Sequence, residues 1–106
     1  MLVVTTENIS GHRIDRVLGH AFGVVVRSRG LGGNITASIR SLFGGEIKEY
    51  TEMIEDARKA AIDRMILNAH NMGANAIVMM RFDSGEIGQT MSEIVAYGTA
   101  VVIEKV

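Results

Sequence analysis

The chain has 106 residues, a common size for one domain, so we assign a single domain spanning residues 1–106. Eleven basic and twelve acidic side chains give a formal net charge of −1, which argues against a nucleic-acid-binding protein. The absence of cysteine excludes disulfides and thiolate metal sites. No apolar run approaches the roughly 20 residues of a membrane-spanning helix, and the first residues lack a signal-peptide pattern, so we expect a cytoplasmic protein without membrane contact.

The first part of the chain predicts two strands joined by a turn. Residues 2–6 are short and β-prone, and residues 7–11 have the composition of a turn. Residues 12–27 are rich in valine and predict one long strand, with a bend at Gly19 or Gly23.

A glycine-rich stretch follows the long strand. Within it, Ile35 to Phe43 has helical spacing, Asn34 is a suitable N-cap, and Gly44 is a suitable C-terminal stop. These features predict a short helix of about two turns.

The strongest pattern of the chain lies in residues 46–72, which predict one long amphipathic helix ended by Gly73. Its apolar residues recur in steps of three and four, at Ile47, Tyr50, Ile54, Ala57, Ala61, Met65, Ala69 and Met72. A second apolar row, Met53, Ala60 and Leu67, recurs every seven residues, and we expect it to face a neighbouring subunit.

The last third predicts a hairpin of residues 75–82 and 90–104, with its turn at Asp83-Ser84-Gly85 or at Gly88. The fold class is therefore α+β: an antiparallel sheet with one long helix on one face, forming a small two-layer subunit. The other sheet face has no predicted cover. Because 47% hydrophobic residues exceed the need of so small a core, we expect self-association to supply that cover.

Blocks of residues spread over almost the whole chain carry a family resemblance. They are Arg27-Ser28-Arg29-Gly30, Gly32-Gly33-Asn34-Ile35, Gly44-Gly45-Glu46-Ile47-x-x-Tyr50-Thr51, Ala57-Arg58, Arg64-Met65, Gly73-Ala74-Asn75-Ala76-Ile77, Arg81-Phe82-Asp83-Ser84 and Glu93-Ile94-x-Ala96-Tyr97-Gly98-Thr99-Ala100-Val101. In this order and spacing they resemble the YbjQ-like family of uncharacterised bacterial and archaeal proteins. The resemblance implies a small α/β subunit in a homopentameric ring, and a heavy-metal-binding label. A chain with no cysteine and three histidines offers little of the soft-ligand chemistry that this label calls for.

The loop between the long strand and the short helix predicts a ligand or anion site, because backbone N–H groups at a helix start can hold an anion and two arginines lie beside it. A dinucleotide fingerprint and a Walker loop are both absent, since Ile35 stands where the fingerprint needs glycine. The predicted site consists of Arg27, Arg29, Gly32, Gly33, Asn34 and Glu46. The same residues also suit a purely structural role, with glycines for sharp turns and arginines paired with acids.

Other functions have less support in the sequence. His12 and His20 lie roughly 26 Å apart on an unbroken strand, too far for one ion within a subunit, although five copies of one histidine could meet at a ring axis. Asp83, Glu93 and Tyr97 on the hairpin are the residues an enzyme would use, and equally suit cross-strand pairing. The sequence names no cofactor, metal or catalytic residue. The expected partner is the chain itself, with a small ligand or a metal at subunit junctions. The alternatives to a ligand-binding ring are a purely scaffolding oligomer and an enzyme that uses Asp83, Glu93 and Tyr97.

Overall fold

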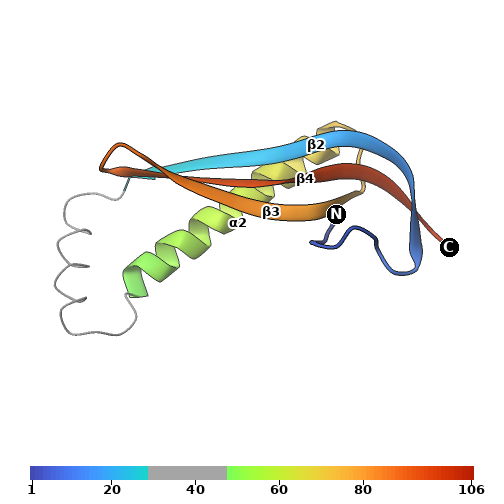
Figure 1. The fold of residues 1–106 in the computed structure, drawn as a ribbon, viewed down its shortest axis with the longest axis horizontal. Helices are drawn as coiled ribbons and strands as arrows, with labels where there is room; N and C mark the ends of the chain where they lie inside the picture. The colour runs from blue at the N-terminus through green and yellow to red at the C-terminus, as the bar shows by residue number, and fades with distance from the viewer. Residues whose placement is uncertain (29–47) are drawn as a thin grey trace.

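The computed structural model describes residues 1–28 and 48–106. Its elements are β1 (Leu2–Val3), β2 (His12–Ser28), α2 (Lys48–Asn71), β3 (Ala76–Ile87) and β4 (Met91–Lys105). The strands form one sheet in the order β1-β3-β4-β2, and α2 crosses one face of it (Figure 1). The predicted α+β class, with one long helix on one face of the sheet, is confirmed.

The long strand β2 pairs with β4 in antiparallel register along its whole length, from His12 opposite Lys105 to Ser28 opposite Met91. The register shifts twice, between Ile14 and Arg16 and between Val17 and Gly19. Gly19 has a φ of 127°, a conformation that favours glycine, so the predicted irregularity at Gly19 is present.

The predicted hairpin is confirmed as the antiparallel pair β3–β4, but β3 runs further than residue 82. Pairing continues to Ile87 opposite Met91, so Asp83-Ser84-Gly85 lies within the strand. The chain turns at residues 88–90, where Gly88 has a φ of 64°. Of the two predicted turns, the one at Gly88 is the turn that forms.

The sheet is mixed rather than purely antiparallel, because β1 pairs in parallel with the first residues of β3. The pairing extends beyond β1 through Met80 N–H to the Val4 carbonyl and Met79 N–H to the Thr6 carbonyl, each at 3.0 Å. Met79 has a φ of 56° at the register shift of β3, so it is the bulge that turns these N–H groups towards the N-terminal segment. The strand predicted at residues 2–6 is therefore present but shorter, and it pairs in parallel where a purely antiparallel sheet was expected.

The core lies between α2 and the sheet. Small side chains on α2, Ala57, Ala61 and Ala69, are buried with Met65. The helix ends as predicted at Gly73, whose φ is 92°, with Ala74 N–H bonded to the Ala69 carbonyl at 3.1 Å and Gly73 N–H to the His70 carbonyl at 2.9 Å.

Two predicted features of α2 differ in the structure. Ile54, expected within the core stripe, is 43% exposed. The second row does not act as a unit, because Ala60 packs partly against its own core while Leu67 is 58% exposed. Of that row, Leu67 is the member most accessible to a neighbouring subunit.

The sheet face opposite α2 is covered at one end only. There the N-terminal segment places Val4 and Ile9 against a second apolar cluster of Ala76, Val78 and Val101. Away from that cluster, Phe22 on β2 is 48% exposed and Tyr97, its direct partner on β4, is 43% exposed. The expected uncovered apolar face is therefore present in the described subunit. None of the helices in the described ranges is long and apolar enough to cross a membrane.

Candidate functional site

The register of the sheet assembles a polar row on the face that carries α2. Because β4 lies between β3 and β2, paired positions form rows across three strands. One row consists of Ser84, Ile94 and Val25, and Val25 is buried in the core. Side chains two residues further along a strand share the same face, so the next row, Glu86, Ser92 and Arg27, also lies on the α2 side.

A groove lies between this end of the sheet and the first turns of α2. One part has a volume of about 250 Å³ and is lined by Arg27, Tyr50, Met53, Ile54, Ala57, Glu86, Ser92 and Ile94. The adjoining part, of about 320 Å³, is lined by Ile54, Arg58, Ser84, Gly85, Glu86, Ser92, Glu93 and Ile94. The two parts share Ile54, Glu86, Ser92 and Ile94, so we treat them as one groove.

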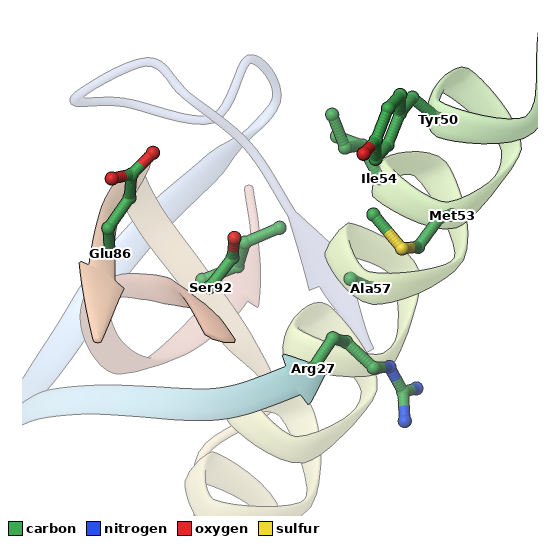
Figure 2. A pocket seen from close by; sticks show the side chains of 8 residues that line it. Arg27, Tyr50, Met53, Ile54, Ala57, Glu86 and Ser92 are labelled. Atoms are coloured by element: carbon green, nitrogen blue, oxygen red, sulfur yellow. The ribbon is translucent and has the colours of Figure 1, made fainter. Parts of the chain in front are cut away.

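Figure 2 shows how the first part is built. Tyr50, Met53 and Ile54 project from α2 on one side, Glu86 stands on β3 across from them, and Ser92 lies between. The guanidinium of Arg27 is turned away from Ser92 and Glu86. The floor is therefore apolar and its rim polar, an arrangement typical of small-molecule sites.

A second arginine is held at the other part of the groove. The Arg58 guanidinium carbon lies 4.9 Å from the centre of the Phe82 ring, a cation–π contact between α2 and β3. Arg58 lines this part of the groove together with Ser84 and Glu86.

Of the six residues predicted to bind a ligand, the structure places Arg27 at the edge of the groove. Arg29, Gly32, Gly33, Asn34 and Glu46, together with the short helix predicted at residues 35–43, lie outside the described residues. Glu86, Ser92 and Arg58 were not among the site residues predicted from the sequence. Glu86 and Ser92 could have been found from the hairpin register, because a turn at Gly88 pairs Glu86 with Ser92, and Ser92 pairs with Arg27.

The hairpin residues considered for catalysis lie near one another in the strand register; Asp83 and Tyr97 are exposed and Glu93 is half-buried. Asp83 pairs with Val95, and Glu93 and Tyr97 flank Val95 on β4. Asp83 is exposed and its Oδ1 accepts a hydrogen bond of 2.9 Å from the Ser84 N–H. Because Asp83 and Tyr97 are exposed, the three residues suit cross-strand pairing better than acid–base chemistry in a water-excluding cleft.

The donor set does not fit a heavy-metal site within one subunit. All three histidines lie in the described ranges, and no group of three His, Cys, Asp or Glu side chains there is arranged to hold a metal ion. His12 Nδ1 is bonded to the Ser10 carbonyl at 3.0 Å, and the His20 ring stacks on Phe22 with centroids 5.9 Å apart. His70 lies in the last turn of α2.

Comparison with known proteins agrees with the resemblance seen in the sequence. Residues 1–104 match the YbjQ family, described as "Putative heavy-metal-binding". A UPF0145 protein of Bradyrhizobium sp. (strain ORS 278) is 72% identical over 98% of this chain and 94% of its own length. One from Thermoplasma acidophilum is 58% identical over 100% of this chain and 89% of its own length.

A solved structure shares the fold. The crystal structure of a protein of unknown function of the DUF74 family from Pediococcus pentosaceus superposes with a TM-score of 0.69 over 98% of both chains, at 14% sequence identity. At that identity the likeness concerns the fold alone. Together, the match over the whole described fold and the identity of the relatives place this chain in the YbjQ-like family of UPF0145 proteins.

Proposed function

We propose that this protein is a cytoplasmic homopentameric ring that binds a small ligand in the groove between α2 and the β3–β4 hairpin, at a junction between subunits. The observation that carries the proposal is the pair of polar residues Glu86 and Ser92, with Arg27 at the edge of the groove, beside an apolar floor of Met53 and Ile54. Both parts of the groove are near the lower end of the roughly 300–1,000 Å³ range of small-molecule pockets. A metabolite of a dozen or so heavy atoms suits this space better than a larger cofactor.

Two unlike apolar surfaces support self-association. Phe22 and Tyr97 mark the sheet face opposite α2, and Leu67 marks the flank of α2. A contact between two different patches of one chain is heterologous, and a heterologous contact whose rotation closes makes a ring. We propose that the α2 flank of one subunit packs on the open sheet face of the next.

The predicted anion site fits the same end of the subunit. Arg27 is the last residue but one of β2, before the glycine-rich loop, and its side chain is exposed and lines the groove. In this proposal Arg27, together with Arg29, Gly32, Gly33, Asn34 and Glu46 as the sequence predicts, forms the border of the groove that a neighbouring subunit completes.

Native mass spectrometry of the untagged protein, purified without chelators, tests the proposal. We expect five subunits carrying additional small-molecule mass that is lost on denaturation. Arg58→Gln should reduce the retained mass while leaving the subunit number unchanged, and Lys59→Gln, on the exposed side of α2, is the matched control. A pentamer without bound mass, which also takes up none from a cell extract, would favour a scaffolding role. A monomer would contradict the proposed assembly.

A further inference from the structure

Helix α2 places a cation over strand β3, and the strand sets what lies beside that cation. Phe82, which packs partly against the core, faces α2, and the Arg58 guanidinium carbon lies 4.9 Å from the centre of its ring. Alternate residues of a strand share a face, so Ser84 and Glu86 follow Phe82 on the α2 side. Asp83, between them, belongs to the opposite face of the sheet.

The nearby acidic residues are separated from this cation. At roughly 3.3 Å per residue, the Cα atom of Glu86 lies roughly 13 Å along β3 from that of Phe82, with Ser84 between them. Glu93 pairs with Gly85, so its side chain belongs to the face away from α2. The positive end of the groove is therefore the end at the Phe82 ring.

Three hydrogen-bond donors line this part of the groove without a partner in the described chain. Within residues 1–28 and 48–106, Arg58 makes no ion pair or hydrogen bond, and the hydroxyls of Ser84 and Ser92 make no hydrogen bond. The contact with the Phe82 ring uses the flat face of the guanidinium and leaves the N–H groups at its edge available. A guanidinium and two hydroxyls are suited to hold an anion.

The remainder of the groove is apolar and small. Met53, Ile54 and Ala57 of α2 and Ile94 of β4 line the part of about 250 Å³, which adjoins the part of about 320 Å³ lined by Arg58. An occupant that fills both parts therefore has a compact apolar body and an anionic head.

The charge of the groove favours a carboxylate as that head. The two parallel N–H groups of a guanidinium match the two oxygens of a carboxylate. Arg58 supplies one positive charge, and the Glu86 carboxylate further along the groove repels a second negative one. A singly charged carboxylate therefore suits the groove better than a doubly charged phosphate.

We propose that the groove binds a monocarboxylate with a compact apolar body, an inference that rests on the proposed ligand-binding function. The Arg58 guanidinium and the Ser84 and Ser92 hydroxyls donate hydrogen bonds to the carboxylate. The body lies against Met53 and Ile94, where a thioether and a branched side chain offer apolar contact. The Phe82 ring positions the guanidinium and does not itself contact the carboxylate.

Three probes with the same phenyl body test this assignment: 3-phenylpropionate, its neutral amide 3-phenylpropanamide, and 2-phenylethyl phosphate. Their dissociation constants are measured on the intact protein by isothermal titration calorimetry near neutral pH. We expect 3-phenylpropionate to bind at least about tenfold more tightly than the amide, because charge-assisted hydrogen bonds are lost with the charge. It should also bind more tightly than the phosphate.

Variants identify the anchor of the carboxylate. Arg58→Gln should weaken binding of 3-phenylpropionate about tenfold and leave the amide within about twofold of its wild-type affinity. A variant that merely loosened the groove would weaken both probes alike. Phe82→Leu, which removes the ring but keeps an apolar side chain, should weaken 3-phenylpropionate about threefold. Lys59→Gln, an equal charge change on an exposed helix position outside the groove, is the matched control. Circular dichroism confirms that each variant is folded.

The outcomes separate this inference from the function on which it rests. If the amide or the phosphate binds as tightly as 3-phenylpropionate, the monocarboxylate assignment is wrong, while the groove remains a ligand site. Equal losses of the carboxylate and the amide in Arg58→Gln would show that Arg58 is not the anchor and would also overturn the assignment. If none of the three probes binds, the assignment is wrong. If in addition no small-molecule mass is retained by the native oligomer, the ligand-binding function is wrong as well.

Discussion

At Gly23 the backbones of α2 and β2 lie close together. A Cβ atom added there would meet the backbone carbonyl oxygen of Ala61 and would lie 2.5 Å from the backbone nitrogen of Met65. Both atoms belong to the helix backbone, so no side-chain rotation relieves the contact, and the helix itself would have to move. The absence of a side chain at this position thus permits the close packing of helix on sheet.

We predict that Gly23→Ala lowers the free energy of unfolding by about 3 kcal/mol, the upper end of the usual cost of overpacking, because backbone rather than side chain must shift. Urea denaturation followed by circular dichroism measures the change. Gly85→Ala is the control, since a Cβ there has its nearest neighbour, Glu93 Oε2, at 4.0 Å. Equal stability of the two variants would mean that α2 is not in backbone contact with β2.

A surface ion pair gives the fold a dependence on pH. Arg13 Nε donates to Asp15 Oδ1 at 2.7 Å and Arg13 Nη2 to Glu104 Oε2 at 2.8 Å. The hydrogen bond from Arg13 lowers the pKa of Asp15 below its ordinary value of 3.8. As pH falls, the unfolded chain therefore takes up this proton first, so the stabilisation is present above the ordinary pKa and is lost as pH falls through the lowered one.

We predict that Asp15→Asn destabilises the protein at pH 6 and that the difference from the wild type narrows progressively as pH falls below the ordinary Asp pKa of 3.8. The free energy of unfolding in urea, measured between pH 2 and pH 6 at low salt, checks this. Because the pair is exposed, the difference should also shrink in about 1 M salt. Asp63→Asn, away from Arg13 on the exposed side of α2, is the control. A difference that does not change with pH would show a packing effect instead.

Helix α2 also satisfies part of the outer edge of β2. Arg64 Nη1 donates to the Val24 carbonyl at 2.6 Å, and Asn68 Nδ2 donates to the Phe22 carbonyl at 2.7 Å. Since β2 is the last strand of the sheet, these carbonyls are on the side that another strand would pair with. The two helix side chains therefore protect the middle of a long edge strand.

We predict that Arg64→Ala and Asn68→Ala each lower the free energy of unfolding by about 1 kcal/mol, the usual net value of a hydrogen bond. The double variant should in addition form aggregates larger than the native oligomer, because the freed carbonyls accept bonds from a second strand. Sedimentation velocity at several concentrations detects them. Lys59→Ala, on the same helix without a role at this edge, should remain unchanged. A stable, unaggregated double variant would show that the edge needs no protection.

The elements could be predicted where a pattern repeats many times. The 3.6-residue period of α2 recurs through Ala57, Ala61, Met65 and Ala69, and all four are buried. The groove could not be predicted in this way, because Tyr50 and Ile54 follow the same period but lie where α2 no longer rests on the sheet. Periodicity states which residues share a face of a helix. The crossing angle, fixed by the contact at Gly23, decides how far along the helix that face stays in contact.

The polar side of the groove depends on pairings that are remote in sequence. Arg27 and Ser92 are brought together by the register of β2 on β4, and Glu86 joins them through the turn at Gly88. A register shift of one residue would turn this row to the other face of the sheet. Both strands were predicted from the sequence, but the position of the turn between them was left open. Only a turn at Gly88 places Glu86 opposite Ser92.

The subunit has an apolar surface on each of two sides, and a head-to-tail ring uses both. Phe22 is on the sheet face opposite α2, and Leu67 is on the flank of α2. A two-fold dimer would instead place the same surface against itself, so that only one of these residues would matter. Substitutions on the two surfaces, alone and mixed, distinguish these arrangements.

We predict that Phe22→Asp and Leu67→Asp are each monomeric, because each carries a charge into one half of a heterologous contact. Mixed in equal amounts, they should form a one-to-one dimer and nothing larger. The Leu67→Asp chain retains an intact sheet face and the Phe22→Asp chain an intact helix flank, so one contact forms and no surface remains to extend it. Native mass spectrometry of the mixture, with one chain labelled with 15N, reads this directly. If Phe22→Asp disrupts the oligomer and Leu67→Asp does not, the sheet faces of two subunits pack on each other. If neither does, assembly uses other surfaces.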